Sequence, residues 1–208
     1  MKTHDTPDYY ASFYGEIFYH VYNRANGEEV LFRADTDRQF FLRQYGKYLS
    51  PFLKTLLGNH FHLVVKVKST EQITAYLESL QPNERTIPQK IFLEAAPDFR
   101  VLHPVLENQF LRLFTSYAMR YNKLYQRKGN LFHRLFKRVA VNSEAHFGNF
   151  VYYVHANCRK HGFQHDFVDY PWSSYGALLS SKPTRLDRHC VRLVWRAGCV
   201  YSISPTRA

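Results

Sequence analysis

The stretch FLKTLLGNHFHLVVKV (residues 52–67) contains two apolar runs separated by a turn signal. Residues 52–57 and 61–67 are rich in the β-branched and aromatic residues that strands favour. Gly58-Asn59 lies between them and is typical of a hairpin turn. The sequence therefore predicts two neighbouring antiparallel strands in this stretch.

Two histidines, His60 and His62, open the second of these strands, with Phe61 between them. Side chains alternate between the faces of a strand, so both imidazoles point to one face and Phe61 points to the other. Such a pair can bind one divalent cation if another element supplies a further nitrogen or oxygen ligand. The alternative is a half-solvated pair at a strand end with no functional role.

The flanking segments complete an alternating pattern of strands and helices. Residues 16–24 and 135–141 have strand composition, and helical periodicity covers residues 36–49, 69–80, 110–125 and 143–160. Residues 81–105 hold four of the nine prolines and are expected to be irregular. This order predicts an α+β fold, a ferredoxin-like sandwich with an antiparallel β-sheet packed by helices. We expect one domain over residues 1–180 and a C-terminal tail over residues 181–208.

The charge balance favours a polyanionic partner. The 208 residues include 28 Lys and Arg against 17 Asp and Glu, a net charge of +11, which favours nucleic acid over an uncharged ligand. Three cysteines without a CxxC pair argue against a disulfide framework. Neither a signal peptide nor a membrane-length apolar run is found, so we expect a cytoplasmic protein without a membrane partner.

The helix predicted at 143–160 offers a partner for the histidines. Tyr153 and Asn157 are four residues apart, so they lie one above the other on the helix surface. Tyr153 could act as a nucleophile, and Asn157 could give a carbonyl oxygen to a metal ion. Alternatively, Tyr153 is a boundary aromatic and Asn157 a helix-end residue. His155 lies on a different side of this helix and has no assigned role.

A basic segment precedes this helix, since no Asp or Glu occurs from Asn108 to Ser143. Lys and Arg neutralise phosphates, so we expect this segment to contact a nucleic-acid backbone. The alternative is a solvated helix face. The expected DNA-binding residues are Arg112, Arg120, Lys123, Arg127, Lys128, Arg134, Lys137 and Arg138.

Five stretches taken together resemble the single-tyrosine transposases of the HUH superfamily, and especially the bacterial REP-associated tyrosine transposases. They are YHVYNRANGEEVLF (19–32), LLGNHFHLVV (56–65), YAMRYNKLYQRKGNLFHRLFKRVAV (117–141), YYVHANCRKHGF (152–163) and YPWSSYGALLS (170–180). The resemblance covers most of the chain. The His-x-His pair, the Tyr-x-x-x-Asn spacing and the WSSY segment, in that order, make it specific.

The resemblance implies a ferredoxin-like HUH fold in which Tyr153 attacks a DNA phosphate. It implies Mg²⁺ or Mn²⁺ as the cofactor, with His60, His62 and Asn157 as its ligands. Cys158 and Gly58 stand where the family has proline, and both departures affect turn geometry rather than the ligands. Tyr152 is the adjacent alternative nucleophile, and the spacing to Asn157 favours Tyr153.

The implied activity is cleavage and joining of single-stranded DNA that carries a hairpin, such as a REP palindrome. The implied intermediate is a 5′-phosphotyrosine, and the enzyme would work as a monomer or a homodimer. One alternative is a DNA-binding regulator of the same fold that no longer cuts. A metallohydrolase of small phosphoesters is the other, although it would require more carboxylate ligands.

Overall fold

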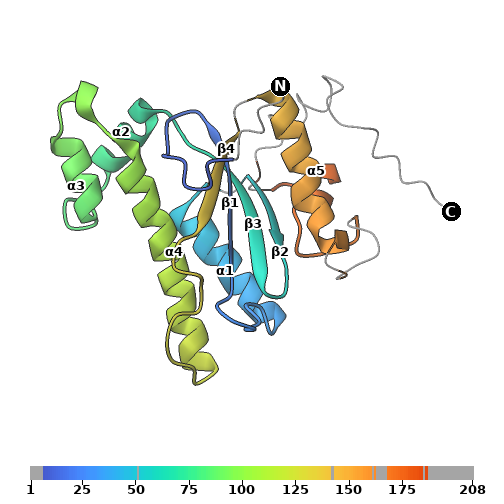
Figure 1. The fold of residues 1–208 in the computed structure, drawn as a ribbon. Coiled ribbons are helices and arrows are strands. Elements are labelled where there is room, and N and C mark those ends of the chain that lie inside the picture. The colour runs from blue at the N-terminus through green and yellow to red at the C-terminus, as the bar shows by residue number, and fades with distance from the viewer. Residues whose placement is uncertain are drawn as a thin grey trace.

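A four-stranded antiparallel sheet forms the centre of the molecule. The computed structural model describes residues 7–50, 52–141, 143–160, 162, 168–184 and 186. The strands are β1 (Phe18–Arg24), β2 (Leu53–Leu56), β3 (His60–Lys66) and β4 (Lys137–Val141), in the order β2-β3-β1-β4 (Figure 1). Each neighbouring pair is antiparallel, which confirms the ferredoxin-like α+β prediction and the hairpin through Gly58-Asn59.

Helices α1 (Asp35–Tyr48) and α4 (Leu102–Leu124) cover one face of the sheet. Strand alternation supplies this face with large apolar side chains that are almost fully buried. The core cluster joins Tyr19 and Val21 of β1, Phe61, Leu63 and Val65 of β3, Phe41 and Tyr45 of α1, and Phe110, Leu113 and Tyr117 of α4. Phe61, the residue between the two histidines, therefore belongs to the core.

Helix α5 (Glu144–Lys160) covers the other face, on the side of the sheet away from α4 (Figure 1). Its apolar stripe includes Phe147, Val151 and Val154, which pack with Leu53 of β2 and Val64 of β3. The short helix α6 (Tyr175–Leu179) adds Leu178 to this second cluster. The second face therefore carries α5 close to the strand that holds the histidines.

The expectation of an irregular segment at 81–105 was wrong. After α2 (Thr70–Ser79), this segment contains α3 (Ile87–Glu94), the short 3₁₀ helix η1 (Pro97–Phe99) and the start of α4. Pro88, Pro97 and Pro104 all lie in the first turn of a helix, where a missing N–H costs no hydrogen bond. These prolines therefore start helices instead of breaking them.

Side chains that accept backbone N–H groups mark the first residues of α1 and α2. Ser69 and Gln72 form a capping box at the start of α2, since each side chain accepts the other residue's backbone N–H. At α1 the carboxylate of Asp37 accepts the N–H of Ala34, so the helix starts one turn before the capping carboxylate. Asp35 and Thr36 lie inside the first turn of α1.

The division of the chain at residue 180 stays a prediction. Only residues 181–184 and 186 of the expected tail are among the described residues. Within the described ranges, no helix combines the length and apolarity needed to cross a membrane.

Candidate active site

The two histidines of β3 face α5 at one end of the sheet. His62 is buried and His60 half-buried, and both share the face opposite to Phe61. In the sheet register Arg24 of β1 lies opposite His60, and Tyr22 lies opposite His62. Lys137 of β4 lies opposite Tyr22 on the far side of β1. Two cationic side chains therefore lie in the same two rows of the sheet as the histidines.

A cavity of about 590 Å³ opens above these rows. The ends of the strands line it together with the segment before β4 and one residue of α5. The lining residues are Tyr22, Asn23, Arg24, Asn59, His60, His62, His133, Leu135, Lys137 and Tyr153. The cavity therefore joins the His-x-His pair, two tyrosines, Arg24 and Lys137 from four parts of the sequence.

Tyr153 meets the histidines edge to face. Its ring centroid lies 5.6 Å from that of His62 and 5.7 Å from that of His20, and the rings are nearly perpendicular at 84° and 82°. The side chain is 39% exposed. Tyr152 is 49% exposed and does not line the cavity. Of the two adjacent tyrosines, Tyr153 is the one beside the imidazoles.

His20 of the neighbouring strand β1 lies beside His62 on the same face of the sheet. Nε2 of His20 is 2.9 Å from Nδ1 of His62, and burial lowers the pKa of His20 to about 4. A neutral His20 can accept the Nδ1 proton of His62, and that tautomer directs the Nε2 lone pair of His62 outward. Nδ1 of His60 is 2.7 Å from Oδ1 of Asn59, an acceptor, which likewise favours Nε2 as the ligand atom of His60.

Asn157 lies one turn beyond Tyr153 but does not line the cavity. Its side chain is 1% exposed, and Nδ2 donates a 2.6 Å hydrogen bond to the backbone carbonyl of Tyr153. Its buried Oδ1 has no hydrogen-bond partner among the described residues. A buried carbonyl without a partner costs about 1–3 kcal/mol, which a cation near this atom would offset.

The candidate donors for a cation are therefore two imidazoles and one amide oxygen. Across the described parts of the chain, no group of three or more His, Cys, Asp and Glu side chains is arranged to hold a metal ion.

The burial of Tyr22 raises its pKa to about 12, and the nearby phenols of Tyr9 and Tyr153 act in the same direction, so the Tyr22 phenol stays protonated at neutral pH.

Three residues of the basic segment are engaged inside the protein. Arg120 pairs with the buried carboxylate of Asp37 at 3.0 Å. Arg138 is buried, pairs with Glu107 at 3.3 Å and donates to the carbonyl of Ala11. The third is Arg127.

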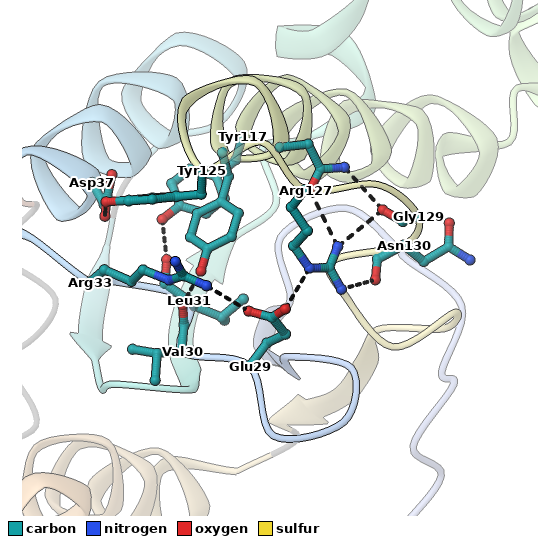
Figure 2. A network of polar contacts seen from close by, with 12 residues as sticks. Glu29, Val30, Leu31, Arg33, Asp37, Tyr117, Tyr125, Arg127, Gly129 and Asn130 are labelled. Carbon is teal, nitrogen blue, oxygen red and sulfur yellow. Dashed lines mark hydrogen bonds and ion pairs between the residues drawn. The ribbon is translucent and has the colours of Figure 1, made fainter.

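Arg127, just after α4, connects the loop between β1 and α1 with the loop that follows α4. Its Nε donates to Glu29 at 2.7 Å, and its guanidinium also bonds the carbonyls of Gly129 and Asn130 (Figure 2). Arg33 donates to the same carboxylate (Figure 2). The acids that pair with the basic segment thus come from outside it.

The other predicted DNA-binding residues are on the surface. The exposed members are Arg112, Lys123, Lys128, Arg134 and Lys137. Lys137 lines the cavity, and the guanidinium of Arg112 lies 5.0 Å from the ring centroid of Tyr48. The basic segment is therefore divided between internal ion pairs and exposed cations.

Sequence reasoning missed His20, Tyr22 and Arg24. All three lie on β1 at alternate positions, so they share the face that the histidines of β3 occupy. The signal was present in the strand predicted at 16–24, whose alternation assigns these three residues to one face. Which face that was could not be read without the pairing to β3.

No protein-family model matches this sequence, and no curated protein matches it. A solved structure of a REP-associated tyrosine transposase bound to a REP hairpin is similar to this chain, with a TM-score of 0.54. The similarity covers 83% of this chain and 86% of the other, at 13% sequence identity. At this identity the likeness concerns the fold, and the chain shares the α+β fold of that transposase.

Proposed function

We propose that this protein cuts and joins single-stranded DNA through a covalent tyrosine intermediate. The observation that carries the proposal is the position of Tyr153, whose ring meets His62 on the wall of a cavity that Arg24 and Lys137 also line. The shared fold with a REP-associated tyrosine transposase bound to a REP hairpin supports hairpin-bearing DNA as the substrate class.

The proposed reaction is a transesterification. The Oη atom of Tyr153 attacks the phosphorus of a backbone phosphate, the new O–P bond forms and the bond from phosphorus to the 3′ oxygen breaks. The phenol loses its proton, and the departing 3′ oxygen takes one up. The products are a 5′-phosphotyrosine and a free 3′-hydroxyl, and a second 3′-hydroxyl can reverse the step without ATP because one phosphodiester replaces another.

The phenol must be activated before it attacks. A free tyrosine side chain has a pKa of about 10, so ionising a free phenol at neutral pH costs about 4 kcal/mol. Positive charge beside the attacked phosphate offsets part of this cost by stabilising the developing negative charge. Arg24 and Lys137 lie in the rows of the sheet beside the histidines and are suited to this role.

We also propose that His60, His62 and Asn157 hold Mg²⁺ or Mn²⁺. The hydrogen bonds at Nδ1 of both histidines favour Nε2 as the ligand atom. Oδ1 of Asn157, without a partner in the described parts of the chain, suits a hard cation. When bound, such a cation polarises a phosphoryl oxygen. The exposed cations would bind backbone phosphates of the DNA at positions other than the cleavage point. They are Arg112, Lys123, Lys128 and Arg134.

A DNA-binding regulator without cleavage activity is the second candidate. Asn157 does not line the cavity, and the donor set contains no carboxylate, so the cation site is weaker than that of a dedicated metalloenzyme. The same shortage of carboxylates disfavours a metallohydrolase of small phosphoesters. The formation of a covalent adduct separates the candidates.

The test uses hairpin-bearing single-stranded DNA and Mn²⁺, followed by a denaturing gel. A DNA labelled at its 3′ end should migrate with the protein, and one labelled at its 5′ end should give a shorter free strand. Tyr153→Phe should abolish the adduct and keep DNA binding, whereas Tyr152→Phe should keep both. If wild-type protein binds the hairpin and forms no adduct, the regulator is the correct function.

A further inference from the structure

The segment Tyr170–Tyr175, which contains WSSY, lies along the outer edge of β2. Ser173 bridges Thr55 of β2, and the N–H of Leu56 donates to the carbonyl of Trp172 at 3.0 Å. The Tyr170 hydroxyl donates to the carbonyl of Leu56 at 2.6 Å. The segment thus pairs with the backbone of an edge strand that would otherwise expose its polar groups.

A buried contact joins this segment to α5. Oγ of Ser174 lies 2.8 Å from Nε2 of His155, and it accepts the N–H of Lys54 in β2 at 3.1 Å. The backbone N–H of Ser174 donates to the carbonyl of Lys54 at 2.9 Å. His155 is 1% exposed and Ser174 is fully buried. One hydroxyl group therefore connects the α5 helix directly to β2.

The contact is close to both halves of the candidate site. His155 lies two residues after Tyr153, so the two side chains leave the helix about 160° apart and face different surroundings. Lys54 is followed by Thr55, which lies opposite His62 in the sheet register. A short chain of contacts thus runs from the helix of Tyr153 through Ser174 and β2 to His62.

We propose that the hydrogen bond between His155 and Ser174 positions α5 and thereby sets the distance between Tyr153 and His62. The apolar stripe of α5 also packs the helix against the sheet. Apolar packing alone tolerates small translations and rotations of a helix. A buried hydrogen bond is directional, and removing the Ser174 hydroxyl would take this partner from the buried Nε2 of His155. His155 and Ser174 are positioning residues, because neither lines the cavity.

The catalytic consequence rests on the proposed function, whereas the position of Tyr153 can be measured without it. The variants are His155→Leu, Ser174→Ala and their combination. Val154→Ala is the matched control, because Val154 is buried on the same helix within the apolar cluster. His155→Gln restores a side-chain polar group and serves as a rescue.

The first readout is the ¹⁹F resonance of 3-fluorotyrosine placed at position 153, which the nearby rings of His20 and His62 shift. We expect both single variants to move this resonance toward that of an exposed fluorotyrosine, with the double variant no further displaced. Val154→Ala should lower stability and keep the resonance, and His155→Gln should restore it in part. An unchanged resonance in folded His155→Leu and Ser174→Ala protein overturns the proposal.

The second readout is the single-turnover rate of adduct formation at saturating DNA. A displaced nucleophile should lower this rate about tenfold to a hundredfold while the DNA affinity changes less than about twofold. A shifted resonance in protein that never forms an adduct would refute the proposed cleavage and leave the positioning role intact. A lowered rate with an unchanged resonance refutes the positioning role.

Discussion

His20 and His62 share a hydrogen bond across neighbouring strands, with Nε2 of His20 at 2.9 Å from Nδ1 of His62. Because this contact involves Nδ1, it orients the ring of His62 while Nε2, the proposed ligand atom, is left for the metal ion. His20→Phe keeps an aromatic ring and removes the ring nitrogens. We expect it to weaken Mn²⁺ binding about tenfold to a hundredfold, as is usual for a lost partner of a metal-binding histidine, measured by titration calorimetry.

Thr55→Val is the control for this variant. Thr55 is buried on β2 and lies opposite His62 in the register, so the change disturbs the same part of the sheet without touching His20. It should leave Mn²⁺ affinity unchanged. If His20→Phe binds Mn²⁺ as tightly as the wild type, the proposed role of His20 behind His62 is wrong.

The side-chain oxygen of Asn157, which has no hydrogen-bond partner among the described residues, gives a second prediction. Asn157→Ala removes Oδ1 and should weaken Mn²⁺ binding about tenfold or more, because the site loses an oxygen ligand. Asn157→Asp keeps an oxygen there and adds charge, so it should bind Mn²⁺ at least as tightly as the wild type. The neighbouring Cys158→Ala should bind normally. Equal affinity in Asn157→Ala would show that the oxygen ligand comes from another residue.

The sheet and most helices could be predicted because their information is local. Alternation places Phe61, Leu63 and Val65 on the face that the core requires, and Ser69 with Gln72 marks a helix start within four residues. Helix α3 was missed because a proline count does not separate Pro88 in a first turn from a proline in a helix interior.

The candidate site was only partly visible because it depends on contacts between distant segments. The pairing of Arg127 with Glu29 joins residues 98 positions apart, so the sequence showed a cation and not its partner. The spacing of Tyr153 and Asn157 left the approach of Tyr153 to the histidines as one of two alternatives, and the family resemblance favoured it. The role proposed for His155 required knowing that residues 170–175 run beside β2.

The stability of the metal-free protein should fall as the pH drops from 7 to 5. Burial lowers the pKa of His20 and of His155 to about 4, below the value of about 6.5 in the unfolded chain. Folding therefore favours the neutral rings, and their contribution is complete above pH 6.5 and decreases toward pH 4. Each histidine should cost up to about 2 kcal/mol of unfolding free energy at pH 5.

Urea unfolding in EDTA at several pH values measures this loss. The hydrogen bond from Arg127 lowers the pKa of Glu29. The stability that this carboxylate contributes is therefore lost only as the pH falls below the ordinary glutamate pKa of about 4.5. The change in stability from pH 7 to 5 is left to the histidines. The double variant His20→Gln/His155→Gln should show a flatter profile over that interval. A wild-type profile without a slope between pH 7 and 5 would contradict burial of these rings in the neutral form.

Arg127 and Lys128 are adjacent basic residues with different expected roles. Arg127 bonds Glu29 and the carbonyls of the following loop, so Arg127→Gln should lower the free energy of unfolding by about 1–3 kcal/mol. Lys128 is exposed, so Lys128→Gln should change stability by less than about 0.5 kcal/mol.

If Lys128 contacts a phosphate, its variant should weaken binding to all DNA sequences and reduce the salt dependence of affinity by about one ion. Arg127→Gln should keep the wild-type salt dependence, because its guanidinium neutralises a carboxylate of the protein. The opposite result, a reduced salt dependence in Arg127→Gln with unchanged stability, would show that Arg127 releases Glu29 to bind DNA.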